Sequence, residues 1–408
     1  MISKDDAIAI FESQFELYNK LENGPIEEDF FEVEIREIKF SKKDIADKLG
    51  IKPKQVEDLI EQMEENGEYF VRNNSNQYTM SQEQATQLTK LAGKKTIPEI
   101  RRSKSGKNFI VPVVIVNTAK GGIAKTTTAI HLAVAAALDF VRDQRVIVID
   151  GDPQGSVVKQ LAPIELATKF NTLLSMIEAN AELSREERLA PEKQEEIRNI
   201  LVNEVLLDTY LDNLRIVPSD FCDTAIELII QNQLTKDAEA AKNIYNDLVV
   251  TPLTQEAELI IIDTSPSPNA TTNNQYYAAN HVTLCTTGRK QDYRSFIAHH
   301  QYMVGVMKQA PETFGGYLSI KTVVTKHIDN NTKLSQAMKK NIARVNSVSD
   351  VHMAIIHENV KYEEASDEKL PLQLFNSAND KPYKSAIQEI DDLYTSFIQN
   401  INVHLFEE

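Results

Sequence analysis

The sequence predicts an α/β fold in which helices cover both faces of a mostly parallel, twisted sheet, preceded by a smaller helical domain. From residue 111 onward, short apolar runs alternate with helical stretches, a pattern typical of buried parallel strands. A loop rich in lysine and glycine also joins the first apolar run to a long helix. We expect strands at Val113–Asn117, Arg145–Asp150, Asn213–Val217, Glu258–Asp263, His281–Thr286, Ile320–Thr325 and His352–His357.

Length and composition narrow the class of protein. The chain has 408 residues, 42% hydrophobic and 25% charged, which is too long for one hydrophobic core and indicates two or more structural units. No run of about 18 apolar residues occurs, so no membrane-spanning helix is expected. The N-terminus carries acids where a signal peptide has basic and apolar segments. Two cysteines, Cys222 and Cys285, do not make a disulfide framework. These features predict a cytoplasmic protein.

The net charge is −16, from 44 basic and 60 acidic residues. Taken globally, this charge repels nucleic acids and anionic membranes. Any binding to DNA must therefore come from local basic patches.

The first 40 residues are expected to hold one helix and a connector. In the stretch Ser3–Glu22, the residues Ile8, Phe11, Phe15 and Tyr18 recur at helical spacing and share one face. Two interpretations stay open: the face packs within its own domain, or it pairs two copies of the chain as a dimerisation helix.

Residues 41–89 read as a winged helix-turn-helix domain. Ser41 is placed to cap a first helix, Gly50 makes a tight turn, and Pro53 opens a second helix that runs to Asn66. Two short runs separated by the polar turn Asn73–Asn76 then predict a hairpin, the wing. Short helical pairs also occur as pure packing units, so the pattern alone leaves that alternative open.

The basic residues of this domain gather at the start of the second helix, the end from which a recognition helix reads base edges. Five carboxylates further along that helix, such as Glu57 and Glu61, would oppose phosphates. The candidate DNA-binding residues are Lys42, Lys43, Lys52, Lys54, Gln55 and Arg72.

A basic stretch follows at residues 90–110. Between Lys90 and Asn108 it holds seven basic residues and one acid, Glu99. It reads as a linker between domains, either simply solvated or able to bind phosphate. The remaining residues, 111–408, are expected to form one nucleotide-binding domain.

The loop after the first strand carries the strongest chemical signal. An apolar strand, a loop rich in lysine and glycine and a helix, in that order, let backbone N–H groups and a helix N-terminus cradle phosphates. Lys125 is placed to contact phosphate oxygens, and Thr126 to bind Mg²⁺ through its hydroxyl. The strict G-x-x-x-x-G-K-[ST] pattern fails because Ala119 and Ala124 replace both glycines. The expected nucleotide contacts here are Lys120, Gly121, Gly122, Ile123, Ala124, Lys125, Thr126 and Thr127.

Carboxylates follow two other predicted strands. Asp150 and Asp152 end the second strand beside a Pro-Gln-Gly turn, and Asp263 ends the strand ELIIID. The carboxyl ends of parallel strands form the crevice in which α/β folds bind ligands. Asp150 has an alternative role as a helix cap. The three motifs in this order predict a nucleotide-hydrolysing ATPase.

The segments KGGIAKTTT, DGDPQGS and IIIDTSPSP resemble the ParA family of DNA-partition ATPases, which are P-loop NTPases with a deviant Walker A motif. The resemblance covers most of residues 111–395. It implies that ATP is sandwiched between two subunits and that Lys120 reaches the partner subunit's phosphates. It also implies that Lys125 and Asp152 act with Lys120 in catalysis, Asp152 by orienting the attacking water. Thr126, Asp152 and Asp263 would serve Mg²⁺, partly through water, and Lys326 would approach the nucleotide.

A winged helix ahead of the ATPase resembles the longer ParA subtype of large plasmids and secondary chromosomes. This resemblance implies a homodimer that takes up ATP or ADP with Mg²⁺ and is located on the nucleoid. The ATP form would bind DNA without sequence preference, a ParB-type partner would stimulate slow hydrolysis, and the winged helix would bind an operator and repress its own operon. The expected site for sequence-tolerant DNA is a helix with Lys339, Lys340 and Arg344, although such residues are often only solvated surface charges.

Other classes fit less well. A MinD-like ATPase should end in a basic amphipathic helix, whereas Ser385–Glu408 contains five acids and no lysine or arginine, so no membrane partner is expected. The remaining alternative is a transcriptional repressor that senses ATP and ADP and has no role in segregation.

Overall fold

The computed structural model describes residue 13 and residues 35–103, 109–118, 120–330, 332–377 and 380–406. The described residues from Glu37 onward belong to one compact unit. The predicted N-terminal helix at residues 3–22 lies outside the described residues, Ser13 excepted. Its role in dimerisation stays a prediction.

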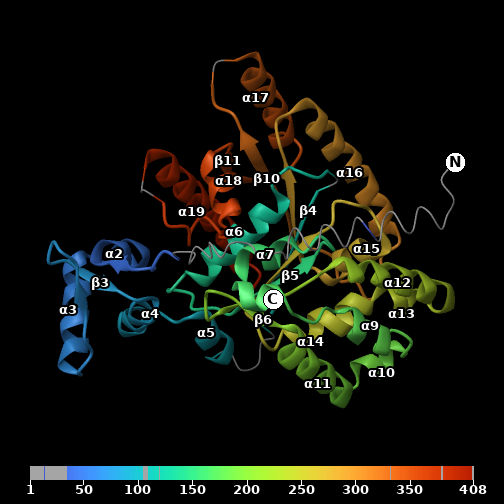
Figure 1. Ribbon diagram of the computed structural model, residues 1–408, viewed down its shortest axis with the longest axis horizontal. Coiled ribbons are helices and arrows are strands. Elements are labelled where there is room, and N and C mark those ends of the chain that lie inside the picture. The colour runs from blue at the N-terminus through green and yellow to red at the C-terminus, as the bar shows by residue number, and fades with distance from the viewer. Residues whose placement is uncertain are drawn as a thin grey trace. The chain divides into compact units, whose positions relative to one another are not determined.

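An eight-stranded sheet forms the centre of this unit (Figure 1). Its strand order is β11-β10-β9-β4-β8-β5-β7-β6, and every neighbouring pair is parallel except β6 and β7. The strands are β4 (Val113–Asn117), β5 (Val146–Gly151), β6 (Leu207–Asp208), β7 (Leu214–Val217), β8 (Leu259–Thr264), β9 (His281–Thr286), β10 (Ser319–His327) and β11 (Val351–His357). The predicted α/β fold with a mostly parallel sheet is confirmed, and β6 is an addition that the sequence did not indicate.

Alternate residues of each strand enter two separate hydrophobic cores, as the two-residue period of a strand requires. Val114 and Val116 of β4 pack on one face with helices α6 (Lys125–Ala137) and α19 (Lys381–Asn402). Val113 and Ile115 pack on the other with helices such as α12 (Thr224–Lys236) and α15 (Ala270–Ala278). Burial on both faces explains why the strands read as continuous apolar runs.

Helices fill the connections between strands, including the predicted helical insertion before β6. The α-helices after β4 are α6 (Lys125–Ala137), α7 (Ser156–Leu161), α8 (Ile164–Ala167), α9 (Leu174–Asn180), α10 (Arg185–Leu189), α11 (Pro191–Ile200), α12 (Thr224–Lys236), α13 (Ala238–Lys242), α14 (Thr251–Leu253), α15 (Ala270–Ala278), α16 (Lys290–Lys308), α17 (Lys333–Asn346), α18 (Val360–Asp367) and α19 (Lys381–Asn402). Short 3₁₀ and π turns lie at Leu201–Val205, Phe221–Asp223 and Asn246–Val250.

Ahead of the sheet lies a small block of three helices and three short strands. It contains β1 (Phe40–Ser41), α2 (Lys42–Leu49), α3 (Pro53–Glu65), β2 (Val71–Arg72), β3 (Tyr78–Met80) and α4 (Gln82–Leu91). Ser41 caps α2 through a capping box, and Gly50 ends it with φ +67°, a conformation that glycine adopts without strain. The helices and hairpin lie where the sequence predicts them. That the block is a DNA-binding winged helix stays a prediction.

The block shares a core with the region that contains the eight-stranded sheet. Phe140, from the loop after α6, is fully buried among the block's apolar residues, and its ring lies 4.8 Å from that of Phe40. The Thr86 hydroxyl donates a hydrogen bond to the Phe140 carbonyl at 3.3 Å. These contacts fix the block to the loop that follows α6.

The stretch expected to be a basic linker also makes structural contacts. Helix α5 (Ile97–Ser103) presents Arg101, whose guanidinium donates to the Thr254 carbonyl at 2.8 Å and pairs with the buried Glu258 carboxylate at 3.3 Å. Residues 104–108 lie outside the described parts. The domain boundaries at residues 40, 89 and 110 stay predictions.

The first and last described segments of the sheet-containing region meet. Phe109 and Phe406 form an antiparallel bridge, their rings 5.6 Å apart, and Ile110 N–H donates to the Leu405 carbonyl at 3.0 Å. In the part of the chain that the structure describes, no helix has both the length and the apolar character needed to cross a bilayer.

Candidate nucleotide site

The loop between β4 and α6 lies at the centre of the sheet's carboxyl edge. Gly122 and Ala124 both have positive φ, +76° and +63°, so the loop curls and α6 begins directly after it at Lys125. Ala124 therefore occupies a left-handed conformation that glycine would adopt without strain. The curled loop points a helix N-terminus at one space, as phosphate binding requires.

Lys125 and Thr126 converge on a buried carboxylate. The Lys125 Nζ atom lies 2.6 Å from Asp263 Oδ1, and the Thr126 hydroxyl donates to Asp263 Oδ2 at 2.6 Å. Burial raises the pKa of Asp263, while the Lys125 charge and both hydrogen bonds act against that rise. This arrangement holds a cation and a hydroxyl together at the start of α6.

Lys120 makes an ion pair on the other side of the loop. Its Nζ atom contacts Asp292 Oδ1 of α16, and Asp292 also accepts a hydrogen bond from the Thr287 hydroxyl. The Lys120 side chain is 39% exposed, whereas that of Asp292 is 5% exposed. Lys120 is thus held within its own chain but can reach solvent.

Asp150 and Asp152 have different surroundings. Both Asp150 oxygens accept backbone N–H bonds, from Asp152 at 3.2 Å and from Val157 at 3.0 Å. Asp150 therefore ties the start of α7 to β5, which is the capping alternative. Burial, helped by the nearby Asp263 carboxylate, raises the pKa of Asp150 well above its ordinary range. Asp152 instead lines the pocket described next.

A pocket of about 300 Å³ gathers most of the predicted nucleotide contacts. It is lined by the loop residues Lys120, Gly121, Gly122, Ala124, Lys125, Thr126 and Thr127, together with Asp152 and Lys326. Ile123 is the exception in the loop, since its side chain is buried in the core, and its carbonyl accepts a hydrogen bond from the Thr325 hydroxyl at 2.8 Å. Asp263 is fully buried and reaches the site through Lys125 and Thr126.

Several residues at the site were missed by sequence reasoning. Asp292, Thr287 and Thr325 hold the loop, while Gln154, Ser156 and Pro266 complete the pocket. Gln154 and Ser156 belong to the DGDPQGS segment and could have been included. Asp292 is 172 positions from Lys120 and belongs to no motif that would point to this contact.

The oxygen donors fit a magnesium ion. The Thr126 hydroxyl and the Asp263 carboxylate lie in contact, and Asp152 faces the same pocket. Hydroxyl and carboxylate oxygens are the ligands that Mg²⁺ takes alongside water and substrate phosphates. The predicted set Thr126, Asp152 and Asp263 is therefore chemically suitable.

The N-terminal DNA-binding candidates are partly occupied by contacts of their own. Lys42 pairs with Glu57 at 3.0 Å, and the Arg72 guanidinium stacks 3.7 Å from the centre of the Tyr78 ring. The Gln55 side chain accepts from Lys52 N–H and caps α3. Lys43, Lys52 and Lys54 are exposed, so the basic end of α3 faces solvent.

The second set of DNA-binding candidates lies on α17. Lys339, Lys340 and Arg344 are all exposed, and Lys339 pairs with Asp329 at 2.7 Å. The structure therefore brings these three charges to one helix surface. Their role in DNA binding stays a prediction.

The fold and the site together define the structural class of the protein. A parallel sheet whose central strand runs into a phosphate-type loop at a helix N-terminus, with a buried aspartate on the next strand, is the P-loop NTPase architecture. A family model described as an AAA domain matches residues 111–293.

Among curated proteins, the chromosome-partitioning ATPase Soj of Treponema pallidum is 25% identical over 282 residues, covering 68% of this chain and 96% of that protein. The chromosome partitioning protein ParA of Caulobacter vibrioides is also 25% identical, over 280 residues, covering 68% of this chain and 93% of its own length. By these matches, this chain is similar to the Soj and ParA partitioning ATPases over about two thirds of its length.

Two solved structures show the same fold. One described as a partition protein has a TM-score of 0.64 at 16% identity and covers 98% of both chains. The ATP complex of an McdA variant from Cyanothece has a TM-score of 0.53 at 16% identity, covering 71% of this chain and 97% of its own.

Proposed function

We propose that this protein is a DNA-partition ATPase that segregates a plasmid or chromosome. Its relatives are named for chromosome partitioning. The observation that carries the proposal is the pocket itself, in which Lys120, Lys125, Thr126 and Asp152 surround one space above the buried Asp263. Two cations, a hydroxyl and two carboxylates are the groups that a magnesium–nucleotide complex requires.

Each side chain has a defined part in ATP hydrolysis. Lys125 and the N–H groups at the start of α6 bind phosphate oxygens, which requires the Lys125 ammonium to move from Asp263 toward the nucleotide. Thr126, Asp152 and Asp263 would hold Mg²⁺, which would supply positive charge to offset that of the phosphates. Asp152 accepts a hydrogen bond from the attacking water and so orients it. Slow hydrolysis that a partner accelerates is the expected behaviour.

Lys120 connects hydrolysis to dimerisation. Its ammonium is exposed enough to leave Asp292 and contact the phosphates bound by a second copy of the chain. A cation supplied in trans contributes roughly 10³–10⁵ to phosphoryl transfer in comparable enzymes. Loss of the γ-phosphate removes that contact, so the ATP dimer and the ADP form differ in free energy.

DNA is the proposed second ligand. In the ATP form, the exposed charges on α17 bind duplex DNA without sequence preference, and a ParB-type protein at a centromere stimulates hydrolysis. The N-terminal block, through the exposed Lys52 and Lys54, binds an operator and represses the operon. The cycle would take place in the cytoplasm, on the nucleoid.

The test is binding to random-sequence duplex DNA at one fixed salt concentration, because phosphate contacts make the affinity steeply salt-dependent. The full-length protein is measured with ATP, ADP or no nucleotide, beside Lys120→Ala. Tight binding that needs ATP and is lost in Lys120→Ala is the expected result. Lys169→Ala is the matched control, because Lys169 is an exposed lysine outside the pocket.

Absence of binding to random DNA in every nucleotide state would overturn the partition function. If the same protein then bound its own upstream DNA in a nucleotide-dependent way, the repressor that senses ATP and ADP would be the better account.

A further inference from the structure

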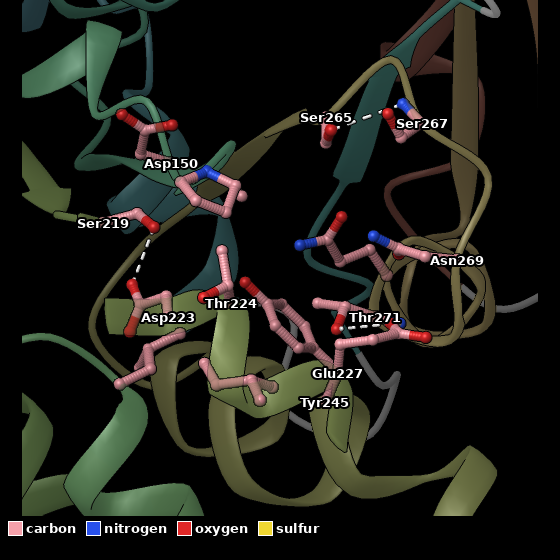
Figure 2. A pocket seen from close by; sticks show the side chains of 15 residues that line it. Asp150, Ser219, Asp223, Thr224, Glu227, Tyr245, Ser265, Ser267, Asn269 and Thr271 are labelled. Atoms are coloured by element: carbon pink, nitrogen blue, oxygen red, sulfur yellow. Dashed lines mark hydrogen bonds between the residues drawn. The ribbon is translucent and has the colours of Figure 1, made fainter. Parts of the chain in front are cut away.

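A second cavity, of about 210 Å³, adjoins the nucleotide pocket at the carboxyl ends of β5, β7 and β8. We name it the Gln275 cavity, and Figure 2 shows the side chains that line it. Its polar lining includes Asp150, Ser219, Asp223, Glu227, Tyr245 and Gln275.

The Gln275 amide has unmet hydrogen-bonding capacity in this cavity. Gln275 is 1% exposed, and within the described parts of the chain neither its Nε2 nor its Oε1 atom has a hydrogen bond of good geometry. Burial raises the pKa of the neighbouring Tyr245 hydroxyl, and a hydrogen bond with the Gln275 amide, outside ideal geometry, acts against that rise. Because a buried amide with incomplete hydrogen bonding is costly, Gln275 points to a ligand that completes it.

A second incompletely bonded acceptor belongs to Asp223. Its Oδ2 atom accepts from the Ser219 hydroxyl at 2.7 Å, whereas Oδ1 is buried without a hydrogen bond of good geometry among the described groups. Burial raises the pKa of Asp223, hydrogen bonds from the Ser219 and Thr172 hydroxyls act against that rise, and the neighbouring Asp220 adds to it. A cation placed at Oδ1 would relieve both effects.

The surroundings of these two acceptors favour a positive charge. Asp150, Asp223 and Glu227 are carboxylates in the lining, and none of the described lining residues is a lysine, arginine or histidine. Glu227 is already occupied by N–H groups of Ala270 and Thr271, and Asp150 by those of its own loop. Asp223 Oδ1 and Gln275 Oε1 are therefore the acceptors left for a ligand.

Apolar walls complete the cavity. Leu173, Ile226 and Pro153 line it beside the polar groups, and the exposed Thr224 and Ser267 open it to solvent. A short aliphatic body with a cationic, donor-rich end matches this lining.

The Gln275 cavity and the nucleotide pocket share their walls. At the end of β5 and in the loop after it, Asp150, Gly151 and Pro153 line the Gln275 cavity, whereas Asp152 lines the nucleotide pocket. After β8, Ser265 faces the first and Pro266 the second. Gly151 permits this closeness, since a Cβ atom there would lie 2.3 Å from the Gln275 amide nitrogen. A ligand in the Gln275 cavity would therefore contact the same loop that positions Asp152 in the nucleotide pocket.

We propose that the Gln275 cavity binds a small aliphatic ammonium ion through Asp223 and Gln275, and that its occupancy changes the affinity of the adjoining pocket for nucleotide. The coupling rests on the nucleotide binding proposed above, whereas the ammonium site does not. By thermodynamic reciprocity, nucleotide would change the affinity for the amine by the same factor.

Calorimetric titration of putrescine into the full-length, nucleotide-free protein at fixed salt tests the site. The neutral diol of the same chain length is the control ligand. We expect saturable binding of putrescine at one site, none of the diol, and a loss of about tenfold or more in Asp223→Asn, the size expected for a hydrogen bond to a charged group. Asp212→Asn removes the same charge at an exposed position and should bind like the wild type.

Gln275→Met separates binding from folding. Because the amide has unmet hydrogen bonds, this variant should keep or raise the melting temperature while losing amine affinity. The site is overturned if putrescine fails to bind, or if Asp212→Asn and Asp223→Asn weaken it equally, which would mean diffuse attraction to an acidic protein.

The coupling is read from ADP affinity with and without saturating putrescine. A change of several-fold supports it, and an unchanged ADP affinity overturns it while leaving the site intact. If ADP does not bind at all, the proposed function fails, and the titration of the nucleotide-free protein still decides the ammonium site.

Discussion

At the scale of single residues, the site is held by pairs of opposite charge that a nucleotide must rearrange. Lys125 forms an ion pair with Asp263, and Lys120 forms one with Asp292, so each cation already has a partner within the chain. Phosphate binding exchanges one anionic partner for another. The carboxylates therefore compete with the ligand for the same two ammonium groups.

Neutralising the Asp292 carboxylate should tighten the binding of ATP. In Asp292→Asn, the Thr287 hydroxyl keeps an acceptor while Lys120 loses its ion pair, so the stability cost is expected below about 1 kcal/mol for this half-exposed lysine. ATP affinity should rise by up to about tenfold, the equivalent of about 1.4 kcal/mol. Competition with a fluorescent ATP analogue measures it. Weaker ATP binding would instead mean that Asp292 holds Lys120 in its productive position.

Stability should depend on pH through His131, a buried residue of α6. Its Nδ1 atom bonds to the Thr127 carbonyl at 2.6 Å, and Nε2 accepts from Leu372 N–H at 3.2 Å, which uses both ring nitrogens of the neutral form. Burial lowers the pKa of His131 from 6.5 to about 4. The unfolded chain thus binds the proton more readily, so this stabilisation is complete above pH 6.5 and is lost as the pH falls toward 4.

The contribution is about 3 kcal/mol at most. Urea unfolding of wild type and His131→Gln between pH 7 and pH 4 measures it. The free energy of unfolding should fall less steeply in the variant, whereas His300→Gln, at an exposed histidine, should follow the wild type. Parallel curves for wild type and His131→Gln would contradict the assignment.

At the scale of elements, the sheet edge depends on close approaches between loops. Gly155 precedes α7 with φ +61°, and a Cβ atom there would lie 2.6 Å from the Ser219 carbonyl oxygen. This contact brings the loop after β7 against the start of α7, whose Val157 N–H bonds to Asp150. Glycine is required here for both conformation and space.

Gly155→Ala should lower the free energy of unfolding by about 2 kcal/mol or more, from left-handed strain and the backbone clash together. Nucleotide affinity should fall as well, because α7 holds the loop that carries Asp152. Gly315→Ala is the control, since nothing lies within 4 Å of a Cβ atom there and it should unfold like the wild type. Equal unfolding of the two variants would count against the required approach.

The sequence predicted these elements to different degrees. The seven strands that the sequence predicts are found within two residues of their predicted ends, because continuous apolar runs bounded by polar turns leave little choice of limits. Strand β6 was missed because two residues, Leu207 and Asp208, carry no periodic signal. The sequence predicted a linker where helix α5 lies, because a run of charged residues suggests solvation. In the structure, Arg101 of this helix instead pairs with the buried carboxylate of Glu258, 157 positions away.

The residues of the candidate site were also predictable to different degrees. Lys120, Lys125, Thr126 and Asp152 could be placed because a loop between strand and helix has a fixed geometry. The role of Asp292 could not be predicted, since its ion pair with Lys120 depends on how α16 packs. The Gln275 cavity could not either, because its lining comes from several separate segments of the chain.

At the scale of the whole molecule, two exposed basic surfaces belong to separate elements. Lys52 and Lys54 lie at the start of α3, and Lys340 and Arg344 lie on α17. If the proposed function holds, the first surface reads an operator and the second binds DNA of any sequence. The two activities should therefore be separable by mutation.

The double variant Lys52→Ala with Lys54→Ala should lose binding to the protein's own upstream DNA and keep ATP-dependent binding to random duplex. Lys340→Ala with Arg344→Ala should do the reverse, and its slope of log affinity against log salt should fall by about two, one for each lost phosphate contact. Electrophoretic mobility shifts over a salt series measure both. Equal losses on both DNAs in either variant would contradict the separation.

The bridge between Phe109 and Phe406 has a consequence for the order in which the segments of the fold follow one another along the chain. Because Phe109, at the start of the sheet-containing region, lies beside the place where the described part of the chain ends, a short linker could join the two positions in a version of the protein without residues 1–108, which would lose the contacts between the N-terminal block and Phe140. New termini could then open at an exposed turn such as Val348, which is 81% exposed. Such a circular permutant would keep every strand pairing of the sheet, and exposed turns are where permutation succeeds. The fold needs its elements as neighbours in space, and their sequence along the polypeptide is one of several that would serve.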